Sequence, residues 1–186
     1  MIKTPPFQNP NSPAPDAVLS ELCSISVQHY GFDGYVHAGE IILHHSLEDD
    51  VRKFFEYSLS LQFPIFSVIP IHKEPFLFND AISCEANNTS GFNYRTIHNS
   101  KTVSKHSLGK AFDVNPAQNI YITYNEDGIE TYRLPQMGLY DTEVPGTLFD
   151  KHPLVHFMKE KNWTWGGDWT PQTGRTDYQH FEKGIF

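Results

Sequence analysis

The chain has 186 residues, enough for one domain with a sizeable core. Aromatic residues make up 14% of the sequence and charged residues 19%, which is typical of a globular protein and excludes a disordered one. The net charge of -8 argues against a nucleic-acid-binding protein, because such proteins present basic side chains to the phosphates. No apolar stretch approaches the roughly 20 residues that span a bilayer, so no membrane span is expected.

The start of the chain is rich in proline, with five prolines among the first 15 residues. This composition predicts an extended, poorly packed arm over 1–18, followed by one folded domain over 19–186. The first 15 residues lack the apolar core of a secretory signal, so we expect either synthesis in the cytosol or earlier removal of a signal. Cys23 and Cys84 are too few for a disulfide framework, and either one bridge or two free thiols is expected.

The first half of the domain predicts a hairpin, a helix and a buried strand. The strands expected here are Leu22–Tyr30, Tyr35–Leu43 and Ile65–Ile69. Apolar residues at helical spacing predict an amphipathic helix that begins at Ser46 and ends near Leu61, before the helix-breaking Pro64. The polar segment Asn79–Asn99 is predicted to be a loop.

The second half predicts further short strands and a second helix. The strands expected here are Ala111–Val114, Ile120–Tyr124, Ile129–Arg133 and Tyr178–Glu182. The middle two flank a turn signal at 125–128 and should form a hairpin. Asp150 is expected to cap the helix, with Pro153 in its first turn. Hairpins mixed with two helices predict an α+β fold, with a mainly antiparallel sheet and flanking helices.

Ten histidines offer several combinations of metal ligands. His152 and His156 lie four residues apart on the predicted helix, but Pro153 stands where a helical zinc-protease motif carries its glutamate base. They are therefore expected to be partly exposed helix residues. His44 and His45 should point to opposite faces of an extended segment. The sequence also contains four isolated histidines, which we expect to be surface or hydrogen-bonded residues: His29, His37, His72 and His98.

Two sequence motifs indicate a metal site more specifically than the histidine pairs above. Residues 104–113 follow the pattern S-x-H-x-x-G-x-A-x-D, and residues 177–182 follow D-x-x-H-F-E, shortly after the run Trp-Gly-Gly-Asp-Trp. His106, Asp113 and His180 supply two imidazoles and a carboxylate, a set able to hold one zinc ion with the fourth position open for water. Asp177 adds a carboxylate that could take a proton from that water.

These motifs resemble the zinc D-alanyl-D-alanine carboxypeptidases of bacteria and the related L-alanyl-D-glutamate peptidases of phage endolysins, which cut peptidoglycan stem peptides. The resemblance covers nearly all of residues 20–186. It implies one Zn²⁺ per chain in a cleft, with the two histidines and Asp113 as ligands, Asp177 as catalytic base and Arg95 beside the metal. Many relatives carry glutamate at the base position. Aspartate resembles the endolysin-type branch, which shifts the expected specificity toward an endopeptidase, while carboxypeptidase and endopeptidase specificity both stay open.

Further candidate residues have a functional and a structural interpretation. Arg95 suits an oxyanion or a carboxylate, and the alternative is hydrogen bonding to loop carbonyls. Ser104 is expected to contact substrate or orient His106, or else to form a turn. Trp165 is expected to wall the cleft and hold substrate, or else Trp163 and Trp165 close the core, an interpretation that we prefer for at least one tryptophan. Glu182 either accepts a hydrogen bond from a metal-bound histidine or lies exposed at a strand end.

The expected function is therefore zinc-dependent hydrolysis of amide bonds in peptidoglycan stem peptides, by a metal-activated water with Asp177 as general base. The alternative is a catalytically inactive, zinc-stabilised binding module that resembles the hedgehog signalling domains. A third interpretation is a domain whose histidines are only structural. The expected partners are stem peptides of the bacterial cell wall, and the chain is expected to be a monomer.

Overall fold

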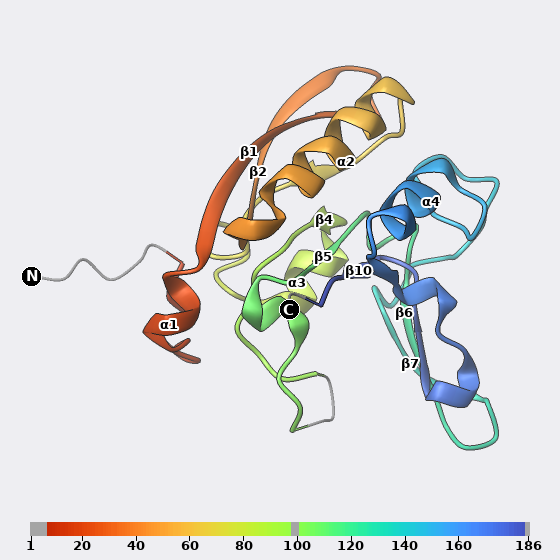
Figure 1. Ribbon diagram of the computed structural model, residues 1–186. Helices are drawn as coiled ribbons and strands as arrows, with labels where there is room; N and C mark the ends of the chain where they lie inside the picture. Colours follow the sequence, from red (N-terminus) through yellow and green to blue (C-terminus); the bar gives the residue numbers. More distant parts are fainter. Residues whose placement is uncertain (1–6, 98–100, 185–186) are drawn as a thin grey trace, which may run out of the picture.

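The computed structural model describes residues 7–97 and 101–184 (Figure 1). The helices are α1 (Asp16–Leu19), α2 (Glu48–Ser60), α3 (Asp80–Glu85) and α4 (Pro153–Glu160). Short 3-10 turns are η1 (His45–Leu47), η2 (Lys105–Leu108), η3 (Gly166–Asp168) and η4 (Pro171–Thr173). The strands are β1 (Leu22–Tyr30), β2 (Val36–His44), β3 (Ser67–Val68), β4 (Asn88–Thr89), β5 (Ala111–Asp113), β6 (Tyr121–Tyr124), β7 (Glu130–Leu134), β8 (Thr164–Trp165), β9 (Arg175–Asp177) and β10 (His180–Glu182). The predicted α+β class is confirmed.

The strands form small sheets, so the prediction of one mainly antiparallel sheet is wrong in its extent. Across the described residues, four separate sheets are present. β1 and β2 form a long antiparallel hairpin, and the orders β5-β10-β8 and β7-β6-β9 are antiparallel as well. β3 and β4 pair in parallel. Short strands such as these bury their apolar sides only together with the helices that cover them.

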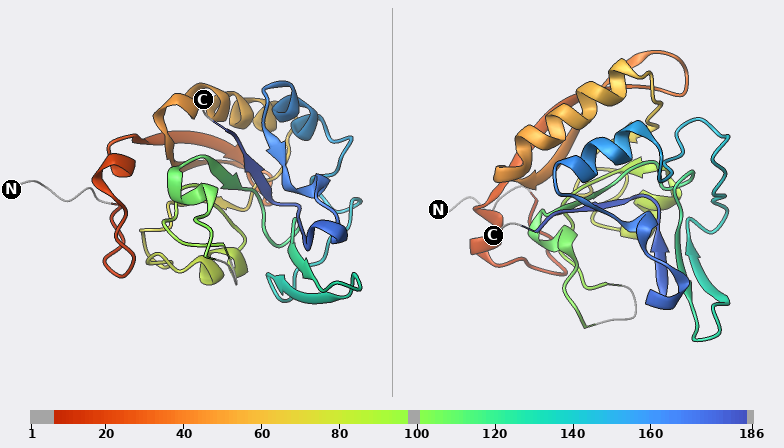
Figure 2. Two further views of the ribbon diagram at one scale, coloured as in Figure 1. Left: turned by 60° about the horizontal axis from the view of Figure 1, so that its bottom comes forward. Right: turned by 45° about the vertical axis from the view of Figure 1, so that its right-hand side comes forward.

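The core lies between α2, α4, the β1–β2 hairpin and the β5-β10-β8 sheet. α2 runs along the hairpin, and α4 lies beside α2 (Figure 2). The ring of Phe54 on α2 lies 5.2 Å from that of Phe112 on β5 and 5.9 Å from that of Phe181 on β10, measured between centroids. Because side chains alternate along a strand, burying Phe112 and Phe181 in this core turns their neighbours on β5 and β10 to the opposite face.

Both predicted helices are present, but their first residues differ from the prediction. α2 begins at Glu48 because η1 precedes it, and the ring of His44 accepts a hydrogen bond from the Ser46 backbone. α4 is capped by His152 instead of Asp150: its Nδ1 accepts from the Leu154 N–H at 3.2 Å. Short polar side chains are the usual caps, so sequence rules do not favour a histidine here.

The segment predicted as the loop Asn79–Asn99 contains α3 and β4. The Asn79 side chain caps α3 by accepting from the Ile82 N–H at 3.1 Å. Asn88 is buried, and its amide bonds both the N–H and the C=O of Ile69 at 3.0 and 2.8 Å. Polar residues in this segment thus build structure by bonding the backbone. The strand predicted at 65–69 is reduced to β3, and His98 lies outside the described residues.

Part of the segment predicted as a poorly packed arm packs onto the domain. Ala14 and Leu19 are buried in a small cluster with Ile42 and Phe92. The Gln8 side chain also donates to and accepts from the Ala14 backbone, at 3.1 and 3.0 Å. The two cysteines of the chain are free thiols in this structure. Within the described ranges, no helix has the length and apolar character to cross a membrane.

We predict that His152 makes the stability of the fold depend on pH. Burial between Phe63 and Phe149 lowers the pKa of His152 to about 4. The unfolded chain therefore binds a proton near pH 6.5 that the folded chain excludes, so the free energy of unfolding falls as the pH drops from about 6.5 to 4. After allowance for solvent screening, we expect a loss of about 1 to 2 kcal/mol.

Urea unfolding at pH 7 and pH 5 measures this loss in the wild type and in His152→Asn, which keeps a capping side chain. The drop should be smaller in the variant. His156→Asn is the matched control, because that ring is exposed on the same helix. An identical drop in the wild type and His152→Asn would contradict the prediction.

Candidate metal centre

Strand pairing brings two of the three predicted ligands together. His180 of β10 stands directly opposite Asp113 of β5 in their antiparallel ladder. Side chains at such positions have Cβ atoms about 5 Å apart and share one face of the sheet. With Phe112 and Phe181 in the core, Asp113 and His180 point away from it together. Residues 67 positions apart in the chain therefore become neighbours by register alone.

The third predicted ligand, His106, is held by the η2 turn. The Ser104 side chain begins the turn by accepting from the His106 N–H at 3.3 Å. Gly109 ends it with a φ of 64°, and a Cβ there would lie 2.5 Å from Leu22 Cδ2 and 2.6 Å from the His44 nitrogen. Only glycine fits this left-handed, close-packed position. The glycine of the first motif is thus required to bring η2 against the β1–β2 hairpin.

Three donor atoms converge at this point. His106 Nε2 lies 3.1 Å from His180 Nδ1 and 3.2 Å from Asp113 Oδ1, and His180 Nδ1 lies 3.0 Å from the same oxygen. All three residues are buried. Ligand bonds of about 2.1 Å in a tetrahedral arrangement put donor atoms roughly 3.4 Å apart, so these separations are close to those around one small cation.

The outer ring nitrogens explain why the inner ones face a cation. His106 Nδ1 lies 2.7 Å from the Gly91 carbonyl oxygen, and His180 Nε2 lies 3.1 Å from a Glu182 carboxylate oxygen. Each of these oxygens accepts a hydrogen bond from the N–H of its ring, which leaves a lone pair on each inner nitrogen in the neutral tautomer. Two facing lone pairs beside a carboxylate repel unless a cation lies between them. The residues therefore fit a metal ion, with Gly91 and Glu182 orienting the two rings.

The charge distribution agrees with a cation site. Burial raises the pKa of Asp113, but the adjacent His106 and His180 outweigh burial and hold that pKa well below its usual range. Burial lowers the pKa of His180, and its hydrogen bonds to Asp113 and Glu182 more than compensate, so the pKa is raised to about 10. Without a metal the site attracts protons, which a bound cation would displace.

A second group of possible ligands corrects one prediction. His44 and His45 do not point to opposite faces: their rings stack at 4.7 Å, because the chain leaves β2 and turns into η1 between them. Glu21 lies 3.6 Å from His44 Nε2 and 3.4 Å from His45 Nδ1. However, His45 Nδ1 donates to the Glu21 carbonyl and His44 Nδ1 accepts from Ser46. This exposed group is satisfied internally, and we assign the metal site to the buried one.

Asp177, the predicted base, lies on β9 opposite Tyr121 of β6. The first glycine of the Gly-Gly pair, Gly166, permits this position, because a Cβ there would lie 2.4 Å from the Asp177 carbonyl oxygen. Asp177 Oδ1 is buried and has no hydrogen-bond partner among the described residues. Burial, with a contribution from Asp113, raises the pKa of Asp177 to about 6. A buried, unpaired carboxylate oxygen is costly, so its partner is expected to be a water or a ligand.

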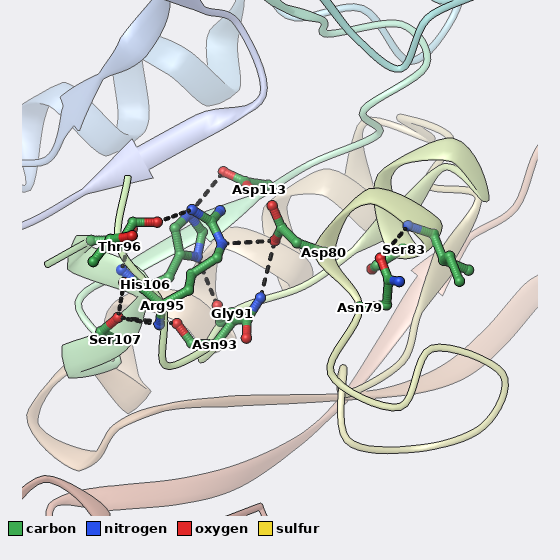
Figure 3. Close-up of polar contacts among 12 residues, drawn as sticks. Asn79, Asp80, Ser83, Gly91, Asn93, Arg95, Thr96, His106, Ser107 and Asp113 are labelled. Carbon is green, nitrogen blue, oxygen red and sulfur yellow. Dashed lines mark hydrogen bonds and ion pairs between the residues drawn. The ribbon is translucent and has the colours of Figure 1, made fainter. Parts of the chain in front are cut away.

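Arg95 is held in place by a residue that the sequence did not single out. Its Nε lies 3.0 Å from Asp80 Oδ1, at the start of α3, and the same oxygen accepts from Asn93 at 3.1 Å (Figure 3). Arg95 also donates to the Thr96 carbonyl at 3.3 Å, as the structural interpretation predicted. The Ser107 hydroxyl accepts from the Arg95 N–H at 2.8 Å and so fixes its backbone to η2. Asp80 and Ser107 gave no sequence signal beyond being polar.

These side chains line one cavity of about 420 Å³. Among the predicted site residues, it is lined by Arg95, Ser104, His106, Asp113, Asp177, His180 and Glu182. Trp165 follows its structural interpretation instead of the substrate-binding one: it is 2% exposed, belongs to the core and donates to the Tyr178 carbonyl at 2.8 Å. Trp169 lines the cavity instead, 5.4 Å from the His180 ring. The run Trp-Gly-Gly-Asp-Trp, which ends at Trp169, was the sequence feature that pointed to this residue.

Comparison with known proteins gives a match to the part of the chain that contains the candidate metal ligands. Residues 98–183 match a family model described as D-alanyl-D-alanine carboxypeptidase. The matched part contains the three candidate ligands and Asp177, and it confirms the family resemblance that the motifs carry. Searches of curated proteins and of solved structures found no match.

We predict that Glu182→Gln weakens metal binding without unfolding the protein. Loss of the carboxylate removes the charged acceptor that orients His180, and such partners typically contribute 10- to 100-fold in metal affinity. Competition with a chromogenic chelator measures the affinity. Glu160→Gln is the matched control, because Glu160 contacts His156 at 3.2 Å on the exposed side of α4. Equal metal affinity of Glu182→Gln and the wild type would contradict the prediction.

Proposed function

Starting from the match of residues 98–183 to the D-alanyl-D-alanine carboxypeptidase family, we propose that this chain is a zinc-dependent peptidase acting on peptidoglycan stem peptides. Two imidazoles and one carboxylate suit Zn²⁺, and a three-residue protein set leaves a position for water or substrate. The observation that carries the proposal is the buried Asp177 oxygen, which has no partner among the described residues and lines the cavity of the metal ligands.

Asp177 is the general base in this proposal. When bound, zinc would polarise the scissile carbonyl and lower the pKa of a coordinated water. Asp177 accepts a proton from the attacking water and later gives it to the leaving amine. Burial raises the pKa of Asp177, which favours a base that can hold the proton until the amine leaves.

Arg95 stabilises the negative charge that develops on the carbonyl oxygen. Asp80 forms an ion pair with the guanidinium, with 3.0 Å between Nε and Oδ1, and the Arg95 side chain lies in the cavity wall. A donor oriented before the reaction starts loses little free energy to reorganisation. Ser104 begins the turn that carries His106, so we assign it to positioning that ligand.

The alternative of an inactive binding module is less consistent with the site. A metal that serves only folding needs no buried carboxylate with a raised pKa next to its ligands. Purified peptidoglycan separates the two functions, since hydrolysis releases new amino groups and shortened muropeptides that mass spectrometry identifies. Zinc-loaded protein should release them, and chelator-treated protein should not.

We predict that Asp177→Asn abolishes hydrolysis and retains zinc. The amide keeps the size of the side chain but cannot accept the proton, and loss of a general base typically costs 10²- to 10⁴-fold in rate. Muropeptide release and zinc content are measured on the same preparation. Hydrolysis at the wild-type rate would remove Asp177 from the mechanism, whereas loss of zinc would make it a metal ligand.

We predict that Arg95→Lys lowers kcat by about 100-fold, because lysine keeps the charge but loses the planar donor fork. Steady-state kinetics on a stem peptide measures the effect. Arg52→Lys is the matched control, since Arg52 forms a comparable ion pair with Glu48 at 2.7 Å on the surface of α2. A change in KM alone would assign Arg95 to ground-state binding instead.

A further inference from the structure

Arg175 lies on the same strand face as the proposed base. It is the first residue of β9 and Asp177 is the third, so both side chains leave the strand on the same side. Thr176 between them points the other way, is buried, and donates to the Trp169 carbonyl at 3.0 Å. Arg175 and Asp177 both line the cavity that holds the metal ligands.

The indole of Trp169 holds the Arg175 guanidinium. The guanidinium carbon lies 4.4 Å from the centre of the indole ring, and the same indole lies 5.4 Å from the ring of His180. Cation–π attraction holds a guanidinium over an aromatic ring without using its N–H groups, which stay available. The arrangement thus orients a cation near the metal ligands without using its hydrogen-bond donors.

Arg175 differs from the other arginines of the chain in its partners. Arg52 pairs with Glu48 at 2.7 Å, Arg95 with Asp80 at 3.0 Å, and Arg133 with Glu130 at 2.5 Å. Within the described part of the chain, Arg175 forms no ion pair with a carboxylate. Its charge contributes, after the hydrogen bond from His180, to lowering the pKa of Glu182, which lines the same cavity, but the structure gives no ion pair between these two side chains. The two parallel N–H donors of a guanidinium match the two oxygens of a carboxylate.

We infer that Arg175 binds the free carboxylate of the substrate residue that leaves. This inference rests on the proposed peptidase function and specifies its substrate class, namely peptides that end one residue beyond the scissile amide. Both side chains leave the same face of β9 and line one cavity, so a single amino acid can present its amine to Asp177 and its carboxylate to Arg175. Asp177 then serves the leaving amine while Arg175 holds the carboxylate.

The test compares two peptides that differ only at this group: a stem peptide ending in D-Ala-D-Ala and the same peptide with a C-terminal carboxamide. The zinc-loaded wild type should hydrolyse the acid with a kcat/KM at least about 10-fold higher than the amide, the effect expected of one charged hydrogen-bonded pair. In Arg175→Gln this ratio should fall close to one. In Arg175→Lys, which keeps the charge, it should be intermediate.

Lys105→Gln is the matched control, because Lys105 also lines the cavity and removing it lowers the local positive charge by the same amount. It should retain the preference for the acid. A preference that survives in Arg175→Gln, or that is lost equally in Lys105→Gln, overturns the inference. Far-ultraviolet circular dichroism checks that each variant is folded.

Calorimetric binding of both peptides separates this inference from the proposed function. Should the wild type hydrolyse neither peptide, the peptidase proposal fails, and binding decides the role of Arg175. Tighter binding of the acid, by about 10-fold and lost in Arg175→Gln, supports the carboxylate site. Equal affinity for the acid and the amide overturns it.

Discussion

The register between β5 and β10 is the constraint on which the candidate site depends. It sets His180 opposite Asp113, and the alternation of each strand sends Phe112 and Phe181 into the core beneath them. A shift of one residue would bury the ligands and expose both phenylalanines, so core packing and site geometry are specified together. Phe54 packs against the rings of Phe112 and Phe181. This packing therefore helps to position the candidate ligand atoms of the neighbouring Asp113 and His180.

Close backbone contacts bring the other elements to this sheet. Gly91 offers its carbonyl to His106, and a Cβ at Gly91 would lie 2.4 Å from the Ile42 carbonyl oxygen. Gly109 and Gly166 allow similarly close contacts to the β1–β2 hairpin and to Asp177. The orientation of His106, the position of η2 and the position of Asp177 thus each depend on a glycine, where any side chain would collide with its neighbours. These glycines allow the close backbone packing that holds the candidate site residues in place.

The sequence predicted much of this arrangement, and its errors have physical causes. Helical and alternating periodicity found β1, α2 and α4, and the motifs named three ligands that do converge. The α3 helix and β4 were missed because their polar side chains bond the backbone instead of showing apolar periodicity. The sequence left open whether Trp165 walls the cleft or closes the core, since burial of an indole depends on the path of η3. Asp80 and Arg175 escaped notice because the contacts that distinguish them, to Arg95 and to the Trp169 ring, arise only when the chain folds.

X-ray absorption at the zinc edge tests most directly whether these residues hold one catalytic cation. We predict one zinc per chain, with two imidazole nitrogens and one or two oxygens at about 2.0 to 2.1 Å and no sulfur. Replacement of His180 by alanine should remove one imidazole from the spectrum. A first shell with sulfur, four protein ligands that leave no position for water, or a spectrum unchanged in His180→Ala would contradict the central claim.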